Sequence, residues 1–148
     1  MHTPRSFDPA FDVRVRSSFA RQMLMLTIGA RVTHVAPGEV DVELPFRDDL
    51  TQQHGFLHAG VVAAIIDSAC GYAALTLMPP DAAVLTSEYK VNLLSPAAGD
   101  AIIARGRVLK AGRTLIVTRG DAFALKGGEE KLVATMLATM MAVRGLQD

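Results

Sequence analysis

One carboxylate lies in the middle of the most apolar segment of the chain. The segment HAGVVAAIIDSACGYAAL spans residues 58–75, and Asp67 is its only acidic or basic residue apart from His58. A buried, unpaired carboxylate is costly, so it either finds hydrogen-bond partners or has its pKa raised. Two interpretations stay open at this point. Asp67 is either a core residue satisfied by the backbone or Ser68, or a catalytic carboxylate in a dry pocket.

The residues just before this segment predict a second chemical group. Residues 55–60 lead into the apolar run, where Ala59 and Gly60 offer little steric obstruction. The first turn of a helix has unpaired N–H groups and the positive end of the helix dipole. Such a helix start can polarise a carbonyl group or hold an oxyanion.

The spacing between these two groups is too long for one helix to use both. Asp67 follows Ala59 by eight residues, which is about 12 Å along a helix at roughly 1.5 Å per residue. His58 and Asp67 also face opposite sides of the helix. If both ends act on one substrate, they come from two antiparallel helices of different chains. The spacing therefore predicts two equivalent sites at the interface of a homodimer.

The elements that position these groups can be read from hydrophobic periodicity. Residues 11–27 predict an amphipathic helix with Phe19, Met23 and Leu26 on one face, and Gly29 ends it. Residues 30–35 and 39–46 predict a hairpin around Pro37 and Gly38, and a polar loop covers residues 47–57.

The rest of the chain predicts one long helix and four strands. The helix covers residues 59–78 and ends at Pro79 and Pro80. Strands over 82–94, 100–110, 113–125 and 131–143 predict an antiparallel meander, with a two-residue hairpin at Ala111 and Gly112. The fold class is α+β, in which a long apolar helix packs on a sheet of about six strands with a short helix in front. Residues 1–148 are expected to form one domain, with residues 1–10 as a loose N-terminal tail.

The long helix is apolar on every side, which predicts burial on every side. A single sheet covers only one side of a helix, so a second copy of the chain is expected to cover the rest.

Composition excludes several classes of function. Fifteen basic residues balance 15 acidic ones and no basic run stands out, so no nucleic-acid partner is expected. The one cysteine cannot form an internal disulfide, and the N-terminus lacks the apolar core of a signal peptide, so we expect a cytoplasmic protein. Residues 59–78 are long enough to span a membrane, but Asp67 at their centre favours a buried helix and no membrane partner.

Taken together, several motifs resemble one known family. Gln52, Gly55, the His58-Ala59-Gly60 triplet and Asp67, nine residues after His58, resemble the motif of hotdog-fold acyl-CoA thioesterases. The resemblance is to the PaaI-like and 4-hydroxybenzoyl-CoA thioesterase group. Residues 88–100 and 111–113 also resemble the third strand and the next hairpin of that group, and the match runs from about residue 17 to residue 143.

The resemblance implies a metal-free and cofactor-free hydrolysis of an acyl-CoA thioester, with CoA as part of the substrate. It implies the hotdog fold, a long helix wrapped by an antiparallel sheet, in dimers that often pair into tetramers. Asp67 would be the nucleophile or the general base for water. The Ala59 N–H would polarise the thioester carbonyl from the other chain, and Gln52 would hydrogen-bond near the carbonyl or the water. His58 would support the loop and the thioester end, and Thr86 would position water near the acid.

The remaining assignments concern binding and the departures from the family pattern. Gly55 and Gly60 are expected to contact substrate, and Arg113 is expected near the phosphates of CoA. Ala59 replaces a family Gly, which a role for its backbone N–H tolerates. Gln52 combined with Asp67 mixes two patterns of the group and leaves the acyl class open. Cys70 is expected to be a small buried residue and not a nucleophile.

Two alternative functions remain at this level. A non-catalytic protein that binds acyl-CoA or a fatty-acyl ligand would keep the same pocket. A hotdog dehydratase would need a His and an acid at another spacing, which the chain does not show. Whether the thioester is carried by CoA or by a carrier protein is also left open.

Overall fold

A computed structural model describes residues 6–146 of the chain. Three α-helices are present in this range, α1 (Phe11–Ala20), α2 (Met23–Ile28) and α3 (Ala59–Leu75), with a short 3-10 helix η1 (Asp48–Leu50). The strands are β1 (Arg31–Ala36), β2 (Glu39–Pro45), β3 (Ala82–Leu93), β4 (Ala101–Ala111), β5 (Leu115–Lys126) and β6 (Glu129–Arg144).

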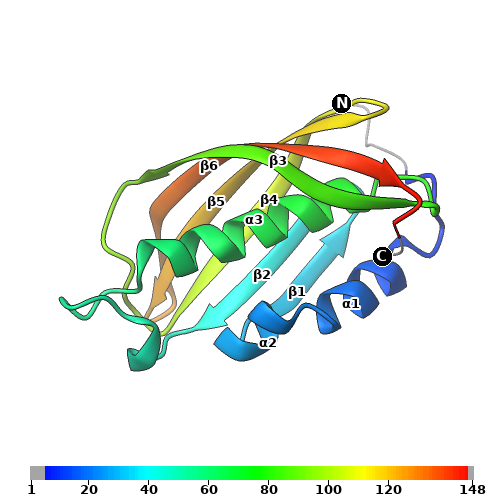
Figure 1. Cartoon of the computed structure of the whole chain (residues 1–148). Coiled ribbons are helices and arrows are strands. Elements are labelled where there is room, and N and C mark those ends of the chain that lie inside the picture. Colours follow the sequence, from blue (N-terminus) through cyan, green and yellow to red (C-terminus); the bar gives the residue numbers. More distant parts are fainter. Residues whose placement is uncertain (1–5, 147–148) are drawn as a thin grey trace.

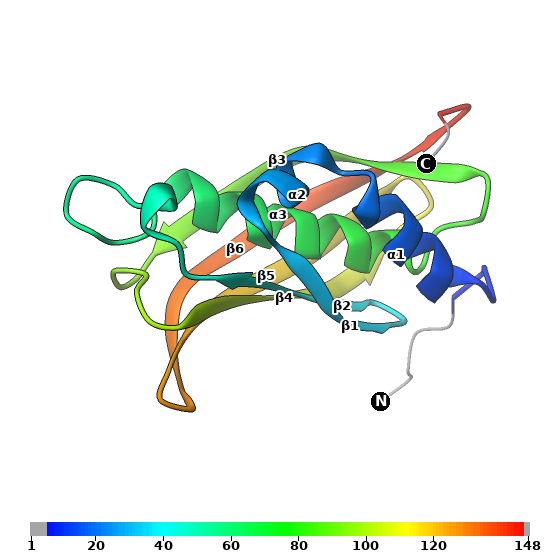
Figure 2. The same ribbon diagram turned by 90° about the horizontal axis from the view of Figure 1, so that it is seen from below.

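The strands form one antiparallel sheet in the order β1-β2-β4-β5-β6-β3. The helix α3 runs along one face of this sheet, as Figure 1 shows. Seen from below in Figure 2, α1 and α2 lie beside α3 and β1, and the loop after η1 extends beyond the start of α3. The predicted α+β architecture with a long helix on a six-stranded sheet is confirmed.

The predicted meander of four consecutive strands is wrong in one respect. Strand β3 pairs with β6 at the far edge of the sheet, and only β4, β5 and β6 are consecutive neighbours. After β3 the chain crosses to β4, and the crossing is fixed where the backbone N–H of Leu94 donates to the carbonyl of Val133 at 2.8 Å. Alternating hydrophobicity identifies a strand but not its neighbour, so this crossing could not be read from the sequence.

The predicted single helix over residues 11–27 is two helices. The chain turns at Arg21 and Gln22, whose N–H groups donate to the carbonyls of Ser18 and Phe19. The turn restarts the helical period, so Met25 and Ile28 are buried in α2. Two of the three residues predicted on the buried face, Met23 and Leu26, are instead 71% and 54% exposed.

Other boundaries follow the sequence more closely. Gly29 caps α2 with a φ of 81°, in the left-handed region that favours glycine. The hairpin at Pro37 and Gly38 joins β1 to β2. Helix α3 ends at Leu75 and not at residue 78, because the next residues form a turn. Of the predicted N-terminal tail, residues 1–5 lie outside the described range, and Asp8 is buried 3.5 Å from Arg14.

Two glycines of the sheet allow α3 to pack closely against it. A Cβ atom at Gly106 would overlap the backbone of Ala69, and one at Gly120 would overlap the side chains of Ile66 and Cys70. Because backbone cannot move aside as a flexible side chain can, Gly106 is the more restricted position. This close contact fixes the distance between the sheet and α3, the helix that carries Asp67.

We therefore expect Gly106→Ala to lower the free energy of unfolding by about 3 kcal/mol. Gly71→Ala is the matched control, since it adds the same methyl group to a buried glycine of α3, where only the Met140 sulfur lies at 4.0 Å. We expect this control to change stability by about 1 kcal/mol or less. Urea denaturation of both variants measures the difference, and equal stabilities would contradict the close-packing argument.

Candidate active site

The start of α3 is held in place by backbone hydrogen bonds from the preceding loop. The N–H of His58 donates to the carbonyl of Leu50 at 3.0 Å, and the N–H of Leu57 donates to the carbonyl of Ala97 at 2.9 Å. The imidazole Nδ1 of His58 then accepts from the N–H of Gly60 at 2.8 Å and caps the helix. His58 is therefore the N-cap residue, with its ring proton on Nε2 when neutral.

This capping leaves one N–H of the first turn available. His58 occupies the N–H of Gly60, while the N–H of Ala59 donates to no acceptor among residues 6–146. Ala59 is exposed. An unpaired, exposed N–H at the positive end of a 17-residue helix suits a carbonyl oxygen that gains negative charge.

Gln52 lies beside this helix start. Its N–H donates to the carbonyl of Phe56 at 2.8 Å, and its carbonyl accepts from the N–H of Gly55 at 3.0 Å, which closes a tight loop. Gly55 has a φ of 82°, so its role is to make this turn. Gln52 and Ala59 line the same cavity of about 350 Å³, whose wall includes Phe56 and residues 93–97. The structure thus brings together two of the predicted site residues.

Asp67 and Thr86 form a second pair. The hydroxyl of Thr86 on β3 donates to Asp67 Oδ1 at 2.8 Å. Asp67 is half-buried, and burial raises the pKa of its carboxyl group, while the hydrogen bond from Thr86 acts in the opposite direction. No cation forms an ion pair with Asp67 in the described part of the chain. The result is a carboxylate more basic than an ordinary aspartate.

Sequence reasoning missed a third contact at this helix. Ser68 was considered as the partner that satisfies Asp67, but its hydroxyl donates to Oε1 of Gln22 at 3.0 Å. Gln22 lies at the break between α1 and α2, which periodicity did not reveal. Residues 64, 67, 68 and 71 share one face of a helix. Gln22 therefore contacts the same face of α3 that carries Asp67.

Within one chain these two groups remain apart. The cavity at the start of α3 is lined by Gln52 and Ala59, but not by Asp67 or Thr86. A rise of about 1.5 Å per residue separates Ala59 from Asp67 by about 12 Å along α3. One chain therefore supplies an N–H donor at one place and a carboxylate at another.

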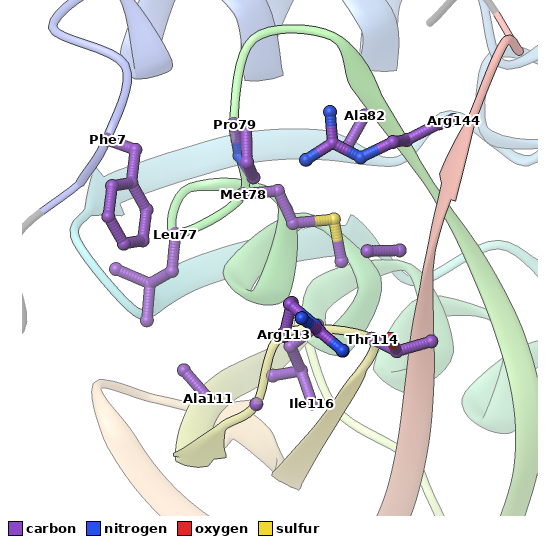
Figure 3. Close-up of a pocket in the computed structure, with 12 residues that line it drawn as sticks. Phe7, Leu77, Met78, Pro79, Ala82, Ala111, Arg113, Thr114, Ile116 and Arg144 are labelled. Atoms are coloured by element: carbon purple, nitrogen blue, oxygen red, sulfur yellow. The ribbon is translucent and has the colours of Figure 1, made fainter.

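A second cavity lies at the opposite end of α3. Its volume is about 710 Å³, and Figure 3 shows Leu77 and Met78, just after α3, facing the hairpin between β4 and β5. Arg113 and Arg144 both line this cavity. Arg144 forms an ion pair with Asp81. The guanidinium of Arg113 makes no ion pair or hydrogen bond with another described residue.

Other chemistry receives no support from residues 6–146. Burial raises the pKa of the Cys70 thiol to about 12, so it stays protonated and is a poor nucleophile. Within this range no three His, Cys, Asp or Glu side chains are grouped as metal ligands would be. None of the described helices has the length and apolar character needed to cross a membrane. His34 and His54 are exposed, and His2 lies outside the described range.

The arrangement of one long helix on an antiparallel sheet is shared with solved structures. A thioesterase family protein from Silicibacter pomeroyi superposes with a TM-score of 0.90 at 53% identity, covering 91% of this chain and 99% of that one. The PaaI protein of E. coli, from the phenylacetic acid degradation operon, superposes with a TM-score of 0.85 at 18% identity, covering 97% and 100%. The fold is therefore the hotdog fold, as the sequence motifs predicted.

Sequence comparison is consistent with this fold. Residues 54–131, which include the start of α3 and Asp67, match the thioesterase superfamily. The human acyl-coenzyme A thioesterase 13 is 32% identical over 87 residues, which are 58% of this chain and 61% of that protein. The chain belongs to the thioesterase superfamily, of the PaaI-like hotdog type. The prediction of a thioester hydrolase is confirmed.

Proposed function

We propose that the protein hydrolyses acyl-CoA thioesters at sites that two subunits share. The observation that carries this proposal is the pairing of an available N–H at Ala59 with a half-buried carboxylate at Asp67, which one helix cannot use together. The choice of acyl-CoA is supported by the human relative, which is named for that activity.

In this proposal the helix start of one subunit binds the thioester. The carbonyl oxygen accepts from the Ala59 N–H, and the side-chain N–H of Gln52 lies nearby to hold the carbonyl or the attacking water. As the carbonyl carbon becomes tetrahedral, its oxygen gains negative charge, which the helix dipole stabilises. Gly60 contributes by its lack of a side chain, while its own N–H stays on His58.

The partner subunit supplies the carboxylate. Asp67 either removes a proton from water, which then attacks the carbonyl carbon, or attacks that carbon directly to form an anhydride that water cleaves. In both routes the C–S bond breaks, the thiolate of CoA leaves and is protonated, and the acid is released. Both routes need the ionised form of Asp67. The Thr86 hydroxyl orients the carboxylate through its 2.8 Å hydrogen bond.

The surface of one chain supports this pairing of subunits. Strand β3 pairs with β6 on one side only, and Leu85, Tyr89 and Leu93 along it are each about half exposed, between 45% and 53%. Val61 and Ala64 on α3 are also partly exposed next to Asp67. A two-fold axis beside β3 would cover both surfaces and bring each Asp67 towards the other subunit's Ala59. Exposed leucines on the outer sheet face, at 109, 115 and 137, would suit a dimer of dimers.

Arg113 would contribute to CoA binding in this proposal. It lines the 710 Å³ cavity and has no anionic partner among the described residues, so its charge is available to a phosphate. Its place at the end of α3 away from Ala59 suits a long substrate that extends along the helix.

Thiol release from acetyl-, octanoyl-, palmitoyl- and phenylacetyl-CoA tests the activity. We expect the wild-type protein to release thiol from at least one of these substrates. Binding of acyl-CoA in calorimetry without any thiol release would contradict hydrolysis of acyl-CoA. That result would favour the second candidate function, a protein that binds acyl-CoA without turning it over.

A further inference from the structure

Apolar side chains line most of the cavity at the start of α3. Its floor consists of buried side chains at Leu57, Val62 and Val133, which are 4%, 2% and 1% exposed. Its walls are exposed side chains, Phe56 at 37%, Leu93 at 53% and Leu94 at 52%. No charged side chain lines it.

Ala59 and Gln52 are part of the wall of this cavity. A thioester carbonyl that accepts from the Ala59 N–H therefore has its carbonyl carbon at the mouth of an apolar space. A thioester carbon carries two substituents, the sulfur of CoA and the acyl chain. The sulfur leads to the pantetheine arm, whose two amide groups need hydrogen-bond partners, and beyond that arm to the charged nucleotide. The cavity offers only the side chains of Gln52 and Ser95 as polar partners. The acyl chain is the substituent that gains from burial here.

We propose that this cavity is the acyl-chain subsite and that it selects an unsubstituted, medium-length acyl group. This inference rests on the proposed hydrolysis of acyl-CoA. A methylene group occupies about the volume of a water molecule, roughly 30 Å³, so a cavity of about 350 Å³ holds on the order of ten such groups. Chains much longer than this would extend past Leu93 and Leu94, beyond the cavity that one chain forms.

The side chains that line the cavity also decide which acyl groups it accepts by polarity. The polar side chains at the cavity wall are those of Gln52 and Ser95. An acyl group with a terminal carboxylate would lose its hydration here without meeting a cation, which is costly. Suberoyl-CoA, with the same chain length as octanoyl-CoA but a terminal carboxylate, is therefore expected to be a poor substrate.

The value of kcat/KM across the acyl series tests this inference, with Leu94→Trp as the variant that fills the cavity. In the wild type, octanoyl-CoA should exceed both palmitoyl- and suberoyl-CoA by at least about tenfold. Leu94→Trp should lower kcat/KM for octanoyl-CoA by at least about tenfold and leave acetyl-CoA within about twofold. Leu24→Trp is the matched control, because Leu24 is similarly exposed at 54% but lies on α2, away from this cavity.

A variant that enlarges the cavity keeps the inference testable if the Leu94→Trp protein fails to assemble. Phe56→Ala removes one wall of the cavity and should raise kcat/KM for palmitoyl-CoA relative to kcat/KM for octanoyl-CoA. If the wild type hydrolyses acyl-CoAs but neither Leu94→Trp nor Phe56→Ala alters the chain-length profile, the assignment of the acyl subsite is wrong and the hydrolase proposal stands. If the wild type hydrolyses no acyl-CoA, the proposed function itself is wrong.

Discussion

Replacing Asp67 by Asn is expected to lower kcat by about 10²–10⁴-fold while making the folded protein more stable at neutral pH. Asn keeps the size of the side chain and can still accept a hydrogen bond from Thr86, so the packing around α3 is preserved. It cannot take a proton from water or attack a carbonyl carbon. Thiol release under saturating acyl-CoA measures the loss. Asp12→Asn on α1, where Asp12 pairs with Arg16, is the control that should retain activity.

The gain in stability follows from the direction of the pKa shift. Burial raises the pKa of Asp67 in the folded state above its value in the unfolded chain. Between these two pKa values the folded state binds more protons, so its stability falls as the pH rises through this window. The substitution removes this destabilisation above the folded-state pKa. Below the unfolded-state pKa both forms are neutral, and the two proteins should have similar stabilities. Urea denaturation at neutral and acidic pH checks the sign.

The same shift predicts the acid limb of the wild-type rate profile. Because Asp67 acts in its ionised form, kcat should fall as the pH drops through the raised pKa, at a higher pH than an ordinary aspartate would give. An Asp67→Asn variant with near-wild-type kcat would remove Asp67 from the mechanism, whatever its stability.

The chemistry of α3 could be predicted because the evidence for it is local in sequence. An apolar run with one carboxylate and a small-residue start predicts a helix, available N–H groups at its start and a carboxylate near its middle, without any knowledge of neighbours. Thr86 lies 19 residues from Asp67, and it was found only through the family resemblance and confirmed as a contact by its 2.8 Å hydrogen bond.

What the sequence did not reveal depends on long-range geometry. The contact between Gln22 and Ser68 requires the break between α1 and α2, which a continuous apolar period does not show. The place of β3 beside β6 depends on a crossing connection. The acyl cavity is formed by Ala59 together with residues near 93–97 and 133, which are brought together only by that crossing.

Ala59→Pro is the second change with a large expected effect, because it removes one N–H and little else. Ala59 is the first residue of α3, where proline is accepted, since its N–H has no partner within the helix. His58 has φ −59° and ψ 137°, the extended conformation that a residue before proline requires. The helix should therefore form normally. The loss of the donor to the carbonyl oxygen should lower kcat by about 10²–10³-fold.

Ala59→Leu is the control for steric bulk, because it retains the N–H while adding a larger side chain at the same exposed position. Circular dichroism and urea denaturation verify that both variants fold. If the leucine variant keeps its activity and the proline variant has the same kcat, the Ala59 N–H does not act on the carbonyl.

Mixing the two inactive variants tests whether subunits share the site. In a hybrid dimer of one Asp67→Asn subunit and one Ala59→Pro subunit, one shared site carries both defects. The other site combines the intact Asp67 of the proline subunit with the intact Ala59 of the asparagine subunit. Unfolding and refolding an equal mixture should therefore restore about a quarter of the wild-type activity, since half of the dimers are hybrids with one intact site each. A site contained within one chain would gain nothing from mixing, because every chain then has a defect. Recovered thiol release would therefore show that Ala59 of one subunit and Asp67 of the other act in the same site.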